Sequence, residues 1–144
     1  MRSHTAVPTE LMQTFQRQMK LCDDLEAVAD SLPSRLDRQF CLHLARQIGP
    51  LLQAAHAAEE LFLFPALGGT GTPAPELVER LRLEHIEDEC FGEEVQHELL
   101  QLGQGQPVLA PEATGYMLRG FFEGLRRHMR HELELLENCG QARA

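Results

Sequence analysis

The chain has 144 residues, 43% of them hydrophobic, and its 13 basic and 22 acidic residues give a formal net charge of −9. This length suits a single domain over residues 1–144, and the acidic balance disfavours nucleic acid and anionic membranes as partners. No signal-peptide pattern opens the chain and no apolar run approaches the ~20 residues that cross a bilayer, so we expect a cytoplasmic protein.

The first predicted helix follows a loose tail, placed at residues 1–8, and Thr9 is its expected N-cap. Apolar residues then recur at alternating steps of four and three over residues 11–32, a spacing typical of the inward face of a bundle helix. Gln18 and Cys22, near the middle of this stripe, are not aliphatic. Pro33 is expected to end the helix, because proline disfavours helical geometry in the residue before it.

The second predicted helix runs from about residue 35 to residue 64. It contains Gly49-Pro50, which we expect to kink the helix or divide it in two. Beyond the proline, the inward positions are Leu52, His56, Glu60 or its neighbour Glu59, and Leu63.

Two further helices follow loops rich in glycine and proline. His85 interrupts the apolar stripe over residues 78–102, and His128 and Glu132 interrupt the stripe over residues 118–139. No segment alternates with the period of two that marks a half-buried strand. We therefore predict an all-α protein, an up-down-up-down four-helix bundle.

The three histidines on these stripes are expected at one height in the bundle. In alternating antiparallel helices, His56, His85 and His128 each lie about ten residues from the same end, roughly 14 Å at 1.5 Å rise per residue. The same count into the first helix arrives at Gln18 to Cys22. The polar interruptions of all four stripes thus converge on one layer of the core.

This layer indicates a metal site. His56 is followed four residues later by Glu60, and two such side chains project only about 40° apart on a helix. His128 and Glu132 repeat the spacing. A single buried histidine is commonly a hydrogen-bonded core residue, but several in one layer are explained by a metal, because buried charges need a partner. Imidazoles and carboxylates suit iron, manganese or zinc; two bridging glutamates favour two ions, and one ion remains the alternative.

The motifs around these residues resemble those of the hemerythrin-like, or HHE cation-binding, family of four-helix bundles. They are H-x-x-x-E before Leu-Phe-Pro on the second helix, Glu-His on the third and His-Met-x-x-Glu on the fourth. The resemblance covers nearly the whole chain. It implies that His56 and His128 are terminal ligands, that Glu60 and Glu132 are bridging carboxylates, and that His85 is the ligand from the third helix.

Cys22 occupies the place of the family's first-helix histidine, three residues before Leu25. It is either a thiolate ligand of one iron or a neutral core residue, and we favour the second because a hard, oxygen-rich site has little use for sulfur. Some other polar residues border the layer, and we expect them to support the ligands or to be exposed: Glu59, Asp88 and Glu89. The remaining histidines fall off the stripes or in the tail: His4, His43, His97 and His131.

Three functions remain open on the sequence alone. The first is a non-haem di-iron protein that binds or senses O₂ or NO, and the resemblance also admits a role in iron homeostasis. The second is an enzyme that repairs damaged iron centres or reduces NO or peroxide at the two irons. The third is a metal-free interaction module. We favour the first, because the chain shows no nucleophile with a base, phosphate loop or nucleotide fingerprint, and we allow a homodimer.

Overall fold

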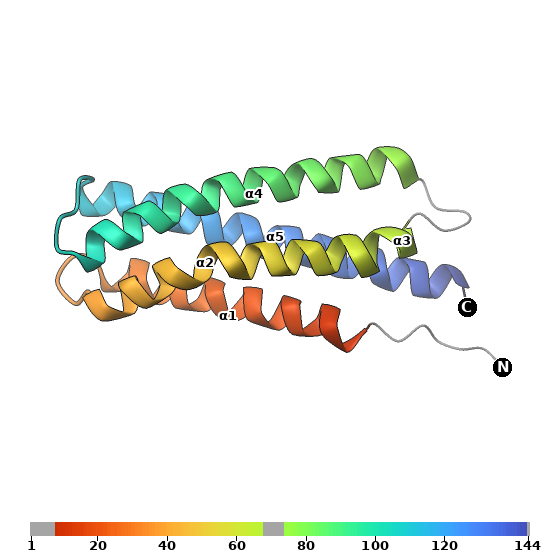
Figure 1. Ribbon diagram of the computed structural model, residues 1–144, viewed down its shortest axis with the longest axis horizontal. Helices are drawn as coiled ribbons and strands as arrows, with labels where there is room; N and C mark the ends of the chain where they lie inside the picture. Colours follow the sequence, from red (N-terminus) through yellow and green to blue (C-terminus); the bar gives the residue numbers. More distant parts are fainter. Residues whose placement is uncertain (1–7, 68–73, 144) are drawn as a thin grey trace.

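The computed structural model describes residues 8–67 and 74–143, so the predicted tail lies almost entirely outside the described residues. All elements in the described part are helical (Figure 1). They are α1 (Thr9–Ser31), α2 (Arg38–Ala58), the π-helical turn η1 (Glu59–Leu63), α3 (Phe64–Leu67), α4 (Ala74–Gly103) and α5 (Pro111–Arg143).

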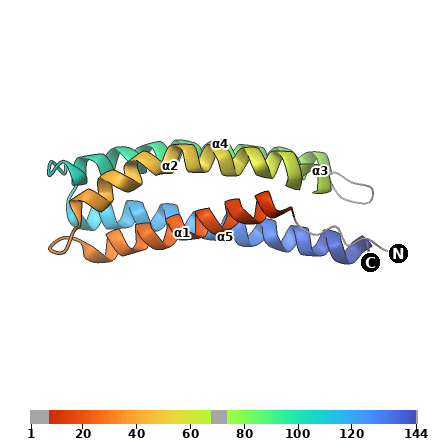
Figure 2. The same cartoon turned by 60° about the horizontal axis from the view of Figure 1, so that its bottom comes forward.

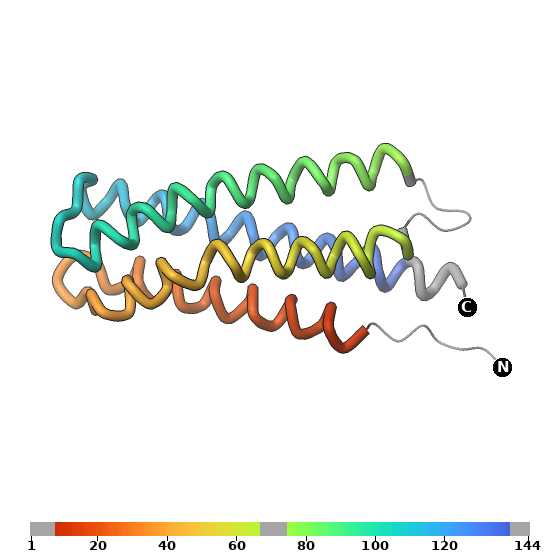
Figure 3. The backbone as a smooth tube through the Cα atoms, in the orientation of Figure 1, coloured from red at the N-terminus to blue at the C-terminus, as the bar shows by residue number. Residues whose placement is uncertain are grey.

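Four long helices form the bundle, and the chain runs up and down through α1, α2, α4 and α5 in turn (Figure 3). α2 packs along α4, and α1 packs along α5 and α2. The start of α1, the short α3 and the end of α5 lie at the same end of the molecule (Figure 1). The predicted all-α, up-down-up-down four-helix bundle is therefore confirmed.

The helix starts differ slightly from the prediction. Pro8, and not Thr9, occupies the N-cap of α1, because the Met12 amide donates to the Pro8 carbonyl at 3.1 Å and this bond draws Thr9 into the first turn. α2 begins at Arg38, later than expected. The Asp37 side chain caps it by accepting a hydrogen bond from the Phe40 amide at 3.1 Å.

Pro50 lies inside α2 without dividing it, since the helix continues to Ala58. Figure 2 shows α2 changing direction between its first and second parts, which is the expected kink. α2 then passes into η1, where the hydrogen bonds span five residues instead of four. This wider turn brings one extra residue into the helix just where the predicted metal ligands lie.

The core is an apolar column with one large polar layer and, apart from it, a buried pair in which the Thr114 hydroxyl donates to Oε1 of Glu98 at 3.3 Å. Its fully buried apolar side chains come from all four long helices, among them Leu25, Ile48, Leu99 and Phe122. Gly92 lets α4 approach α2, because a Cβ there would lie 2.6 Å from Cδ1 of Leu52. None of the helices in the described part of the chain is long and apolar enough to cross a membrane.

Candidate metal centre

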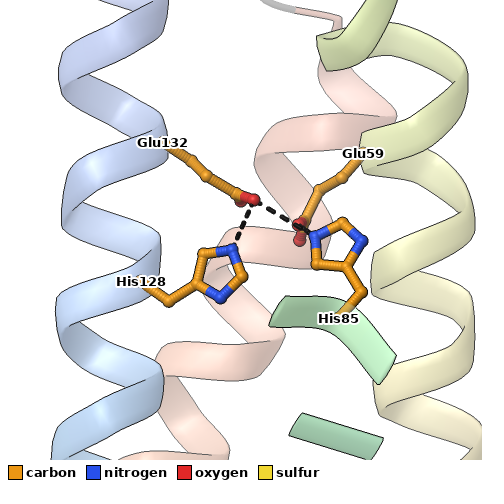
Figure 4. Close-up of side chains that lie close together, drawn as sticks. All are labelled: Glu59, His85, His128 and Glu132. Atoms are coloured by element: carbon orange, nitrogen blue, oxygen red, sulfur yellow. Dashed lines mark hydrogen bonds and ion pairs between the residues drawn. The ribbon is translucent and has the colours of Figure 1, made fainter. Parts of the chain in front are cut away.

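Four buried side chains meet in the polar layer: Glu59 from η1, His85 from α4, and His128 and Glu132 from α5 (Figure 4). One donor atom from each lies within 4.8 Å of the other three. Nε2 of His85 is 2.8 Å from Oε1 of Glu59 and 3.2 Å from Oε2 of Glu132. Nε2 of His128 is 2.7 Å from the same Glu132 oxygen. We call these four residues the central group.

His56 from α2 completes the layer beside the central group. Its ring stacks on that of His85, with centroids 4.0 Å apart and planes 4° from parallel. His128 and Phe64 also pack against His85, at centroid distances of 5.2 Å and 5.4 Å. The three imidazoles therefore form one stacked array, held in place by an aromatic neighbour.

Each imidazole has a carboxylate at Nδ1, and His85 and His128 contact the carboxylates of the central group with Nε2. A carboxylate behind a histidine fixes the orientation of the ring and makes Nε2 a better metal ligand. Nδ1 lies 2.7 Å from Oε2 of Glu89 on His56, 2.9 Å from Oδ2 of Asp88 on His128, and 3.4 Å from Oε2 of Glu60 on His85. This repeated arrangement is typical of histidines that hold a metal.

Two buried polar atoms of the layer have no hydrogen-bond partner among the described residues: Nε2 of His56 and Oε1 of Glu132. Buried polar atoms are nearly always satisfied, so two unpaired ones in the same layer call for a ligand. Both are good donors to a metal ion. The donor set of imidazole nitrogens and carboxylate oxygens therefore fits iron, manganese or zinc.

The two carboxyl groups of the central group have opposite pKa shifts. Burial raises the pKa of Glu59 to about 7, against the opposing effect of its bond to His85. Burial also acts to raise the pKa of Glu132, but hydrogen bonds from His128 and His85 outweigh it and hold that pKa at about 2. Glu132 is thus ionised at neutral pH, and both imidazoles form hydrogen bonds with it.

The pKa values of the imidazoles are shifted by the surrounding charges and by burial. Burial acts to lower the pKa of His85, but bonds to Glu132 and Glu59 raise it to about 9. Burial also acts to lower the pKa of His128, but hydrogen bonds with Asp88 and Glu132 raise it to about 10. At His56 burial and the charge of His85 lower the pKa. Without a metal, protons on His85 and His128 neutralise the buried negative charge, and a bound cation would replace them.

The structure brings most of the predicted site residues together. His85, His128 and Glu132 belong to the central group, and His56 lies against it. Glu60 lies outside the group. Its side chain is 40% exposed, and it contacts Nδ1 of His85 from the outer side.

Glu59 takes the inward position that the resemblance had implied for Glu60. Its side chain is only 2% exposed, because the π-helical turn beginning at this residue shifts the following side chains around the helix axis. The sequence offered both glutamates for this stripe position. Positions three and four residues after His56 lie about 60° and 40° to either side of it, so periodicity could not separate them.

The first helix reaches the layer through Gln18 and not through Cys22. Nε2 of Gln18 donates to Oε2 of Glu59 at 2.9 Å, and the residue is 1% exposed. Cys22 is fully buried in the apolar core, where Sγ lies 3.6 Å from the Phe122 carbonyl oxygen and burial raises the thiol pKa to about 12. The sequence points to both residues, because Gln18 and Cys22 lie on the same inward stripe near the predicted height of the layer.

The polar residues that the sequence did not assign as metal ligands fall into two groups. His43, His97 and His131 are exposed, as their positions off the apolar stripes predicted, and His4 lies outside the described residues. Asp88 and Glu89, expected to support the ligands or to be exposed, are the partners of His128 and His56.

Comparison with known families gives one match: the family model described as Hemerythrin HHE cation binding domain covers residues 10–138. This range includes every residue of the central group together with His56 and Gln18. The corresponding comparisons with curated proteins and with solved structures give no match.

Proposed function

The chain belongs to the hemerythrin HHE cation-binding domain family, and from this premise we propose that its buried centre holds two iron ions and binds a diatomic gas, O₂ or NO. The coarser function needs no proposal: this is a cation-binding domain with a buried His/Glu cluster able to bind metal. The ions, their number and the gas are the proposed part.

One observation carries the proposal. The donor atoms of the central group lie within 4.8 Å of one another, and in the same layer Nε2 of His56 and Oε1 of Glu132 are buried without partners in the described part of the chain. A single ion held by the central group would leave Nε2 of His56 unused. Two ions use every donor, with Glu59 and Glu132 as the carboxylates placed to serve both.

The residues around the centre support a small ligand. Phe64 packs on His85, and apolar side chains of the same helix as His128 are buried in the core, among them Phe122 and Leu125. Bound ferrous iron would supply the electrons for binding O₂ or NO. The protein's own part is to fix the imidazoles through Asp88 and Glu89 and to exclude water from the layer.

Anaerobic loading with Fe²⁺ tests this function. We expect close to two ions per chain, and a new visible absorption when NO or O₂ is added to the loaded protein. The zinc-loaded protein is the matched control, since zinc has no redox chemistry and should show no such band. A loaded iron protein whose spectrum does not respond to either gas would contradict the proposed gas binding.

A second candidate is reduction of NO or peroxide, or repair of damaged iron centres, at the same site. The observation that favours it is the amide of Gln18, which is what α1 offers at the layer in place of an imidazole or a carboxylate. Fewer strong ligands leave an iron more reactive. Repeated turnover of NO or peroxide by the loaded protein separates this candidate from simple binding, and metal-free purified protein would favour an interaction module instead.

A further inference from the structure

A surface groove of about 340 Å³ runs between α4 and α5 beside the metal centre. We call it the α4–α5 groove. Glu84, Glu87 and Asp88 line it from α4, and Gly124, Arg127, His128 and His131 line it from α5.

The groove is continuous with the central group through His128. The side chain of His128 is 8% exposed, whereas those of the other three members are at most 2% exposed. Two groove carboxylates contact its ring from outside: Oδ2 of Asp88 is 2.9 Å from Nδ1, and Oε1 of Glu84 is 3.6 Å from Nε2. The side chain of Glu84 is 36% exposed, so the same carboxylate contacts both solvent and Nε2 of His128.

The charge of the groove favours a cation. Three carboxylates line it against the guanidinium of Arg127 and the protonated ring of His128, so the acidic groups outnumber these cations, in a chain with a formal net charge of −9. Surface carboxylates alone would mean little. Here the carboxylates lead to the buried centre of a cation-binding domain, where Oε1 of Glu132 has no partner within residues 8–67 and 74–143.

We propose that the α4–α5 groove is the route by which a divalent cation reaches the centre, with Glu84 passing it from the groove to His128. This inference rests on the proposed metal binding. It has a distinctive kinetic consequence, because a route is used in both directions. Narrowing it must slow uptake and release in the same proportion and leave the equilibrium affinity unchanged.

Substitution of Gly124 tests the route sterically. A Cβ at Gly124 would meet only Nη2 of Arg127, at an ordinary 3.7 Å, so Gly124→Leu adds bulk to the groove without a clash in the core. Gly115→Leu is the matched control on the same helix, since a Cβ there meets nothing within 4 Å and the residue lines a different groove.

The measurement uses Co²⁺, whose visible absorption reports coordination, with stopped-flow mixing for uptake and excess chelator for release. We expect Gly124→Leu to slow both rates by about tenfold with an unchanged Kd, and Gly115→Leu to match the wild type. Wild-type rates in Gly124→Leu, or slow uptake together with a weaker Kd, would overturn the route.

Two substitutions that change the charge of the groove in opposite directions provide a second test. Glu87→Gln removes an exposed carboxylate of the groove, and should slow Co²⁺ uptake by about three- to tenfold. Arg127→Gln removes the opposing charge and should speed uptake by a similar factor. Both effects should shrink at high ionic strength. Equal rates in the two variants would contradict the proposal.

Failure of the metal site itself gives a different result. If wild-type protein binds no Co²⁺ even at equilibrium, the proposed function fails and the route fails with it. If Co²⁺ binds at equilibrium but the Gly124 and charge variants keep wild-type kinetics, only the route is wrong.

Discussion

Glu132 is the residue on which the centre depends most. It is fully buried, its Oε2 contacts both His85 and His128, and its Oε1 has no partner among the described residues. A carboxylate with one oxygen engaged by ligand imidazoles and the other unpaired is placed to join two ions.

Glu132→Ala should therefore reduce bound iron by about half or more while the helical circular dichroism spectrum remains, because the substitution removes the proposed bridge. Metal analysis after anaerobic loading measures the effect. Glu134→Ala, at an exposed position of the same helix, is the control and should keep its metal. Full iron content in Glu132→Ala would contradict the bridge.

Metal binding should release protons, because in the metal-free protein the raised pKa values of His85 and His128, about 9 and about 10, keep both rings protonated at neutral pH. A metal ion needs the neutral rings. We expect release of about two protons per chain from the two rings at pH 7, with a further fraction from Glu59, whose pKa of about 7 leaves it partly protonated. The apparent affinity should rise with pH until these pKa values are passed. Calorimetry with Zn²⁺ in buffers of different ionisation heat counts the protons. Release of none would contradict the protonated layer.

At the scale of the elements, α1 and η1 decide the composition of the site. α1 places Gln18 against Glu59 and leaves Cys22 in the apolar core. η1 turns Glu59 inward and leaves Glu60 at the rim, where Arg82 lies 3.9 Å from it. The hydrogen bond from Gln18 thus links the two elements and orients a metal-binding carboxylate.

A pair of α1 variants separates the two polar positions of that helix. Cys22→Ala should keep its metal and its spectrum and lose about 1 kcal/mol of unfolding free energy, as expected for a small core truncation. Gln18→Ala should weaken metal affinity by about tenfold, because Glu59 loses the group that orients it. Metal competition and thermal unfolding measure both. Loss of an iron or of an intense visible band in Cys22→Ala would mean that sulfur is a ligand.

At the scale of the whole molecule, the layer joins three of the four long helices directly and the fourth through Gln18. An ion bound only by the assembled layer stabilises the folded bundle by mass action. The sequence allows a homodimer, and the exposed apolar side chains of Leu61, Leu83 and Ile86 are candidates for its contact surface. The mass of the protein in solution would test this proposal.

Removal of the metal should therefore lower the melting temperature, and the loss should grow as the pH rises from 7 to 9. His85 and His128 have folded pKa values above the unfolded 6.5, so their contribution is complete below pH 6.5 and is lost as the pH rises through about 9 and 10. The lowered pKa of His56 acts in the other direction, but only up to its unfolded value of 6.5. The loaded protein should lack this decline, because its histidines are already neutral. Melting curves of chelated and loaded protein at several pH values decide this, and identical midpoints would contradict the metal's structural role.

The sequence by itself determined the helices, the bundle and the family. These follow from the repeat of apolar residues at steps of three and four, from loops of glycine and proline, and from the spacing of His56, His85, His128 and Glu132, all of which are local properties of the chain. The same spacing placed these residues in one layer, because the rise per residue is constant along a helix.

Only the tertiary structure decided which neighbouring residue faces the centre. Periodicity resolves direction around a helix to about one residue, so it left Glu59 and Glu60 as alternatives. The π-helical turn directs Glu59 toward the centre, and no periodicity in the sequence predicted that turn. Gln18 and Cys22 lie on the same stripe one turn apart and are equally buried. The packing of α1 against η1 and α5 brought Gln18 to the layer and Cys22 to the Phe122 carbonyl. Hydrogen bonds between helices depend on distances that the order of residues along one helix does not contain.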